Sequence, residues 1–231
     1  MISRITVGTI ASWKDLATLV DQCSEGDWVF RGESKCGRDL KPKAGRIGSE
    51  KDSSRKLPYR ENDEVVALLL FKRQSRPYLT HQPSSDIEWL AIAQHHGMHT
   101  RLLDWTESIL VAAYFAANRA GTSGDAVIYG AQTLSPTTAA DESNPFKVEK
   151  ITVYHPPHIS PRIPAQRSVF TLHPDPTVDF ANEATLWRVN SDACVRIKQI
   201  LDACAINEAS LFPDLDGLAR YIGWRYKWAK L

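Results

Sequence analysis

The sequence predicts an α+β fold: a single mixed α/β domain with a small, mostly antiparallel sheet. The chain has 231 residues, a length that suits one domain or two small ones, and its 43% hydrophobic and 24% charged residues are ordinary for a globular protein. Segments with helical spacing and short β-prone segments are mixed without strict alternation, which favours α+β over a doubly wound sheet. No internal repeat is visible, so we expect one domain over residues 1–231.

Charge and hydropathy exclude several classes of protein. The net charge is +1, so no field of the whole molecule demands an anionic partner. No apolar run approaches the ~20 residues of a membrane span, and the first residues lack a signal-peptide core. We therefore expect a cytoplasmic protein with no membrane contact. The four cysteines form no C-x-x-C pair, so no metal site is predicted.

Four predicted helices begin at residues that are suited to N-caps, and apolar side chains recur at helical spacing after each of them. Two more helices are predicted towards the C-terminus, where an amphipathic stretch precedes a last helical segment. The caps are Ser12, Asn62, Ser85 and Thr106, the apolar parts of these helices lie within 13–20, 65–71, 89–93 and 109–117, and the later helices cover 191–204 and the residues after Asp214.

Five short strands are predicted from β-prone runs that are bounded by glycine, proline or polar residues. A proline-rich turn separates the last two of them. The strands cover 27–32, 101–105, 126–129, 151–154 and 169–172, and the turn covers 156–164.

Two segments are strongly basic. Residues 35–60 hold nine Lys or Arg and three acids without an apolar period, which predicts an exposed, flexible loop. This loop is either a solvated surface or a flap over a phosphate-bearing ligand.

Residues 220–230 alternate bases with aromatics, which is typical of an amphipathic helix on the core or of a surface for single-stranded nucleic acid. Nucleic acid therefore stays open as a partner, and the macromolecular target is unknown.

The densest polar stretch is 94–106, between two apolar helices. Arg101 and Asp104 must be paired on so apolar a frame, either with each other or with a ligand. A helix that opens after Thr106 would present free N–H groups, which suit an anion. His95 and His99 have a ligand spacing, but Gly97 between them argues against one helix and against a metal.

Four motifs follow one another along the chain: Trp28 to Gly32 with its Phe-Arg-Gly, Gln94 to Trp105 with its following helix, Arg162 to Thr171, and Leu211 to Leu218. Together, over roughly residues 12–225, they resemble the FRG domain family, which is named for its Phe-Arg-Gly. The family pattern reads Gln-His-Tyr-Gly-x-Pro-Thr-Arg. His96 and His99 stand here where it has tyrosine and proline, so they take no family role.

The motif skeleton also resembles ADP-ribosyltransferases of the Arg-Ser-Glu type, which implies NAD as the substrate or cofactor. The resemblance places Arg31 at the NAD phosphates and a hydroxyl-bearing turn at Thr106 and Ser108. Ser168 occupies the position of the catalytic glutamate, so Asp104 or Glu107 would have to supply the carboxylate that stabilises an oxocarbenium ion. The expected catalytic residues are Arg31, Asp104, Thr106, His95 and Gln166, and the expected cofactor-binding residues are Arg31, Gly32, Arg101, Thr106 and Ser108.

The resemblance leads us to expect a nucleotide-using effector, toxin-like and acting in bacterial defence. Two alternatives stay open. One is a sensor that binds a nucleotide or nucleic acid without turnover, and the other is a hydrolase or nuclease that uses His95. Arg31 also has a structural interpretation, in which it pairs with Asp104 or Glu33.

Overall fold

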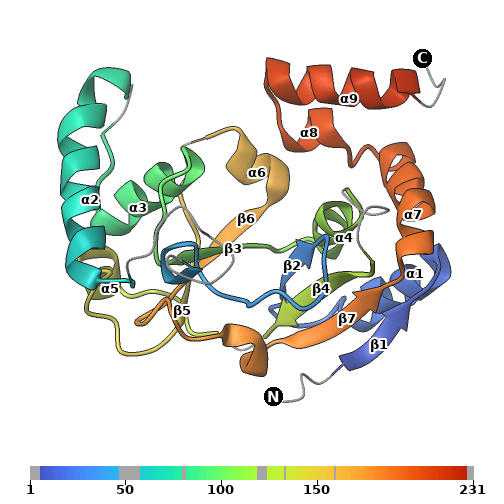
Figure 1. The fold of residues 1–231 in the computed structure, drawn as a ribbon, viewed down its shortest axis with the longest axis horizontal. Coiled ribbons are helices and arrows are strands. Elements are labelled where there is room, and N and C mark those ends of the chain that lie inside the picture. Colours follow the sequence, from blue (N-terminus) through green and yellow to red (C-terminus); the bar gives the residue numbers. More distant parts are fainter. Residues whose placement is uncertain are drawn as a thin grey trace.

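The computed structural model describes residues 6–46, 58–79, 82–118, 124–132, 134–158 and 160–227. Within them seven strands form one mixed sheet in the order β1-β7-β4-β2-β3-β6-β5 (Figure 1). Only β1 and β7 pair in parallel, so the predicted α+β fold with a mostly antiparallel sheet is confirmed. The strands are β1 Thr6–Ile10, β2 Val29–Glu33, β3 Leu102–Thr106, β4 Ala126–Ala131, β5 Thr152–Tyr154, β6 Ser168–Leu172 and β7 Thr185–Val189.

The two strands that the sequence did not predict, β1 and β7, extend one edge of the sheet. Short helices were also missed, because a four- or five-residue helix has too few turns to show a period. The helices are α1 Trp13–Gln22, α2 Glu61–Ser75, α3 Asp86–His95, α4 Ile109–Ala117, α5 Ala139–Ser143, α6 Arg162–Gln166, α7 Ser191–Ala203, α8 Glu208–Leu211 and α9 Leu215–Lys227.

Two predicted helix starts are wrong. The helix α2 begins after Arg60 rather than at Asn62. The helix α4 is capped by Ser108, whose hydroxyl accepts from the Val111 N–H, because Thr106 is still the last residue of β3. The Thr106 hydroxyl instead accepts from the Ser108 N–H at 3.0 Å. The predicted caps Ser12 and Ser85 are confirmed.

The sheet is covered on both faces (Figure 1). Alternate residues of β4 show this: Ile128 packs into a cluster with α4 and α7, and Tyr129 packs into a second cluster with Leu40 and Phe180. The backbone of β2 approaches α4 so closely at Gly32 that a Cβ there would lie 1.8 Å from a main-chain oxygen of the helix. Glycine is therefore required at this position by packing.

Part of the basic segment is buried, contrary to the expectation of an exposed loop. Leu40 and Ala44 are each 1% exposed. The Leu40 N–H donates to Asp179 Oδ1 at 3.0 Å, and the Phe180 N–H donates to the Leu40 carbonyl at 3.1 Å. The contact comes from a segment about 140 residues away, which no local pattern reveals. The rest of the predicted loop, 47–57, lies outside the described residues.

The C-terminal helices form a layer above α4 and α6 (Figure 1). The proline-rich turn contains α6, which ends at Arg167 with a left-handed φ of 46°. The described part of the basic–aromatic run lies in the helix α9, as one of its two interpretations expected, but Gly217 is the only buried residue of that described helix, so its aromatics are not buried in the core. In the described part of the chain, no helix is both long and apolar enough to cross a bilayer.

Candidate functional site

A cavity of about 430 Å³ lies where β2, β3 and β6 meet α6. It brings together most of the predicted site residues, which come from distant parts of the sequence, and adds several that were not predicted. The predicted ones are Arg31, Gly32, His95, Asp104, Thr106 and Gln166, with Ser168 beside them; the added polar ones are Glu33, Lys43, Gln94 and Arg162.

The register of the sheet explains this convergence. Phe30 pairs with Thr106 across β2 and β3, and Thr106 pairs with Ser168 across β3 and β6. The three motifs that carry the resemblance to ADP-ribosyltransferases therefore end in one row across three adjacent strands.

Arg31 uses its guanidinium within the protein. Its Nε and Nη2 donate to Glu33 Oε1 at 3.1 and 2.5 Å, and its Nη1 donates to the Asp104 carbonyl at 2.8 Å. The Asp104 carboxylate lies 3.7 Å from Nη1. Arg31 thus forms ion pairs with both Glu33 and Asp104, as its structural interpretation expected.

Glu33 lines the cavity, but the sequence analysis named it only as a pairing partner of Arg31 and not as an acid of the site. It is 11% exposed, and burial alone would raise the pKa of its carboxyl. The charges of Arg31, Arg46 and Arg38 outweigh burial and lower that pKa below its ordinary value, so Glu33 is ionised at neutral pH. One signal was available: residues two apart on a strand share a face, so Glu33 follows Arg31 into the cavity.

Asp104 is the second carboxylate of the cavity, and it is 52% exposed. Gln94 Nε2 donates to its Oδ1 at 2.8 Å, and the side-chain Oε1 of Gln94 accepts from the Thr100 hydroxyl. The carboxylate is therefore oriented from behind by α3 while it stays accessible to a ligand.

Thr106 and Gln166 connect the elements around the cavity. The Thr106 hydroxyl donates to the Gln166 carbonyl at 2.6 Å, and Gln166 Nε2 donates to the Leu211 carbonyl at 2.9 Å. These bonds link β3 to α6 and α6 to α8. The two side chains thus position the walls of the cavity.

His95 is the last residue of α3 and lines the same cavity. Its Nε2 lies 3.4 Å from Ser160 Oγ. Partial burial, with the charges of Arg162 and His96, lowers the pKa of the imidazole, so the ring is neutral at pH 7. Gly97 has a φ of 97°, and α3 ends before it, so His99 does not share its helix with His95. Among the described residues, no cluster of three His, Cys, Asp or Glu could hold a metal ion.

Three predicted residues lie outside the cavity. Arg101 is fully buried elsewhere and does not pair with Asp104: its Nη2 donates to Glu61 at 2.8 Å, and its Nε donates to Glu64 at 3.3 Å. Ser108 caps α4. Glu107 lines another cavity, where it pairs with Arg167 at 3.3 Å and with His155 at 3.5 Å.

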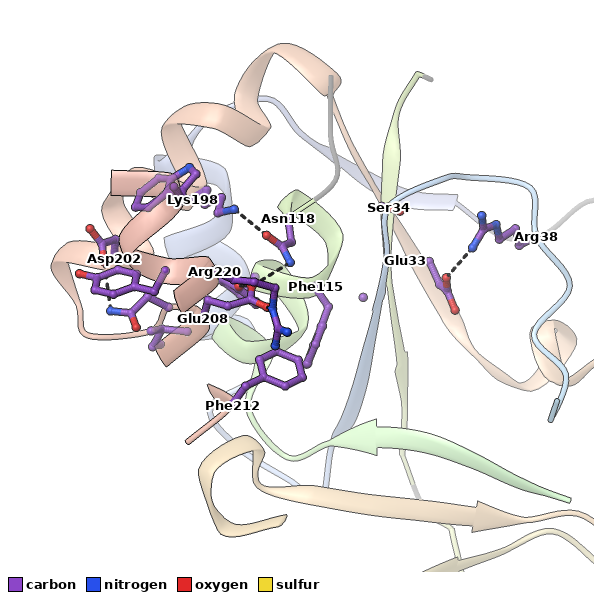
Figure 2. Close-up of a pocket in the computed structure, with 16 residues that line it drawn as sticks. Glu33, Ser34, Arg38, Phe115, Asn118, Lys198, Asp202, Glu208, Phe212 and Arg220 are labelled. Atoms are coloured by element: carbon purple, nitrogen blue, oxygen red, sulfur yellow. Dashed lines mark hydrogen bonds and ion pairs between the residues drawn. The ribbon is translucent and has the colours of Figure 1, made fainter. Parts of the chain in front are cut away.

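A second cavity, of about 660 Å³, adjoins the first. The two cavities share Gly32, Glu33, Phe115 and Phe212. In Figure 2 Glu33, Ser34 and Arg38 stand on one side of it, and Phe115, Phe212 and Arg220 stand on the other. We call the first cavity the carboxylate chamber and the second the aromatic chamber.

Comparison with known proteins identifies one family. Residues 26–124 match the model of the FRG domain, a shorter span than the motif resemblance suggested. No curated protein and no solved structure matches the chain. The matched part runs from β2 to α4 and includes Arg31, Glu33, Gln94, Asp104 and Thr106, whereas α6 to α9 lie beyond it. Residues 26–124 are therefore similar to the FRG domain, in agreement with the resemblance that the motifs indicated.

Proposed function

We propose that the carboxylate chamber binds NAD and that the protein is an ADP-ribosyltransferase-like enzyme that breaks the bond between nicotinamide and ribose. The observation that carries the proposal is the row from β2 through Thr106 to Ser168, which joins the three motifs of that resemblance at one cavity. An effector role in bacterial defence, in the cytoplasm and on a macromolecular target, belongs to the same proposal and comes from the resemblance alone.

The charges of the chamber suit this chemistry. Arg31, Lys43 and Arg162 are the cations that line it, and guanidinium groups suit phosphate oxygens. Cleavage sends the bonding electron pair to nicotinamide, which leaves neutral, and positive charge develops on the ribose. A nucleophile of the target then bonds to the ribose carbon and loses its proton.

Asp104 is the carboxylate that we assign to that developing charge. Ser168, which pairs with Thr106, lines the same cavity but has no charge to offer. Glu33 is held by two bonds from Arg31, whereas Asp104 keeps an exposed carboxylate that Gln94 orients. Removal of one preorganised electrostatic group costs about 10²–10³-fold in rate.

The test is release of nicotinamide from NAD by the purified protein. We expect Asp104→Asn to lower the rate about 10²–10³-fold. The matched control is Glu107→Gln, because Glu107 lies next to the same motif but outside the chamber, and it should keep the full rate. An Asp104→Asn variant as active as the parent would refute the assignment.

A second candidate is a sensor that binds the nucleotide without turnover. It is favoured by Ser168 at the position of the acid and by the engagement of the Arg31 N–H groups within the protein. Calorimetric NAD binding that weakens in Arg31→Lys, without any nicotinamide release, would establish this candidate instead. Lysine keeps the charge but not the fork geometry of the guanidinium.

A further inference from the structure

We infer that the aromatic chamber is a nucleoside site and that it holds the adenosine half of the dinucleotide whose nicotinamide half occupies the carboxylate chamber. The inference rests on the proposed function only for the statement that the nicotinamide half occupies the carboxylate chamber. Its own basis is the composition, charge and position of a cavity that is lined largely by residues of α4, α7, α8 and α9.

Five aromatic side chains line the aromatic chamber. They meet edge to face or stacked: the Phe115 and Phe212 ring centroids are 6.1 Å apart at 87°, and those of Tyr221 and Trp224 are 6.4 Å apart at 27°. Tyr114 is the fifth aromatic residue of the lining. Such rings offer flat faces to a planar heterocycle, and stacking does not depend on which base is bound.

The charges of the aromatic chamber balance. Its cations are Arg38, Lys198 and Arg220, and its acids are Glu33, Asp202 and Glu208. Arg38 lies 3.6 Å from Glu33, and Arg220 donates to Glu208 at 2.7 Å. A wall without excess positive charge suits a neutral ring and sugar better than a phosphate or a nucleic-acid strand, which binds through its phosphates.

Polar groups inside the aromatic chamber can read the edge of a base. Lys198 Nζ donates to Asn118 Oδ1 at 2.5 Å (Figure 2), which leaves other N–H bonds of an ammonium that carries three. The ammonium is 5.0 Å from the centroid of Trp224 and 5.8 Å from that of Tyr114. The chamber therefore places a hydrogen-bond donor beside the aromatic surface that a base would contact.

Size and continuity assign the two halves to the two chambers. Phe115 and Phe212 border both chambers, so a molecule that bridges the pair can reach both. The larger cavity, about 660 Å³, suits the two-ring purine, and the smaller one, about 430 Å³, suits the one-ring pyridinium. The pyridinium is cationic, and the two acids Glu33 and Asp104 line the smaller chamber.

The test is calorimetric titration of the whole chain with three probes: adenosine, nicotinamide mononucleotide and NAD. We expect adenosine to bind, and we expect Trp224→Ala to weaken adenosine and NAD about 5- to 150-fold, the range of one lost stacking contact. Nicotinamide mononucleotide should bind Trp224→Ala as it binds the parent. The matched control is Tyr226→Ala, which removes an exposed aromatic from the same helix and should change nothing.

A second measurement needs no variant, in case Trp224→Ala fails to fold. The parent protein is irradiated with 8-azidoadenosine, and mass spectrometry should locate the label on α4 or on α7 to α9, with protection by adenosine. Label confined to other segments, no adenosine binding, or equal losses in Trp224→Ala and Tyr226→Ala would overturn the inference. Binding of an oligonucleotide but not of adenosine would overturn it as well.

The inference and the proposed function fail separately. Adenosine binding that depends on Trp224, with no nicotinamide release from NAD, would support the nucleoside site and refute the transferase. Nicotinamide release with an unchanged KM for NAD in Trp224→Ala would support the transferase and refute the adenosine assignment.

Discussion

Removal of the Arg31 guanidinium should destabilise the protein through Glu33. Arg31 and Glu33 are 16% and 11% exposed and share two hydrogen bonds, and Arg31 also bonds to the main chain of β3. Breaking a buried pair by removing one partner costs 3–5 kcal/mol as a general range. Arg38 stays 3.6 Å from Glu33 and compensates in part, so we expect about 3 kcal/mol for Arg31→Ala. In a chain of this size that lowers the Tm by about 6–12 °C.

Urea unfolding of Arg31→Ala, Glu33→Gln and the double variant measures this coupling. The double variant should be more stable than Arg31→Ala, because it removes the charge that the single variant leaves without its partner. The pKa of Glu33 is lowered in the folded state, so its contribution is present above its unfolded pKa and is lost as the pH falls through the folded value. The gap between parent and Arg31→Ala should therefore shrink below about pH 4.5. Equal stability of parent and Arg31→Ala at pH 7 would refute the reasoning.

Three more predictions follow from the packing. Gly32→Ala should lower the free energy of unfolding in urea by about 3 kcal/mol, the upper end of the usual cost of overpacking, since its Cβ would meet backbone at 1.8 Å. Gly223→Ala, with open space around it, should be neutral or stabilising by up to about 1 kcal/mol. Burial lowers the pKa of His173 to about 4, so as the pH falls the imidazole is protonated in the unfolded chain before it is protonated in the folded protein. The free energy of unfolding should therefore fall by about 3 kcal/mol between pH 6.5 and 4, and His173→Gln should abolish this loss. Arg101→Ala should cost about 3–5 kcal/mol in thermal or urea unfolding because it strands the buried Glu64; a parent-like melt would contradict this structural role.

The location of the apolar helices and of the central strands could be predicted from local sequence. The helices α3 and α4 are apolar nearly all round, and β2 and β3 are short β-prone runs beside turn residues, so their spacing alone identified them. The residues at which the helices begin were harder to predict from the sequence. Thr106 and Ser108 are both good caps, and only the pairing of Thr106 with Phe30 and Ser168 decided that the strand continues to Thr106.

The membership of the site was predictable in part. Arg31, Asp104, Thr106 and Gln166 were named from motifs, and the register of the sheet brings them to one cavity. Arg101 stands three residues before Asp104 in the same motif, yet its side chain lies in a different cluster with Glu61 and Glu64. No sequence pattern indicates which face of the fold an acid from α2 will reach.

The sequence by itself determined which segments are apolar helices, which are β-prone strands and where the FRG motifs lie. Those features depend on neighbours within a few residues, where periodicity and capping act. The sequence left open whether Arg31 pairs with Asp104, with Glu33 or with a ligand, and the tertiary structure showed that it contacts both acids. The tertiary structure alone decided the burial of Leu40 against Phe180 and the merging of the two chambers at Phe115 and Phe212. Most of these contacts join segments tens of residues apart or more, and their energies depend on burial and distance, which exist only once the chain has folded.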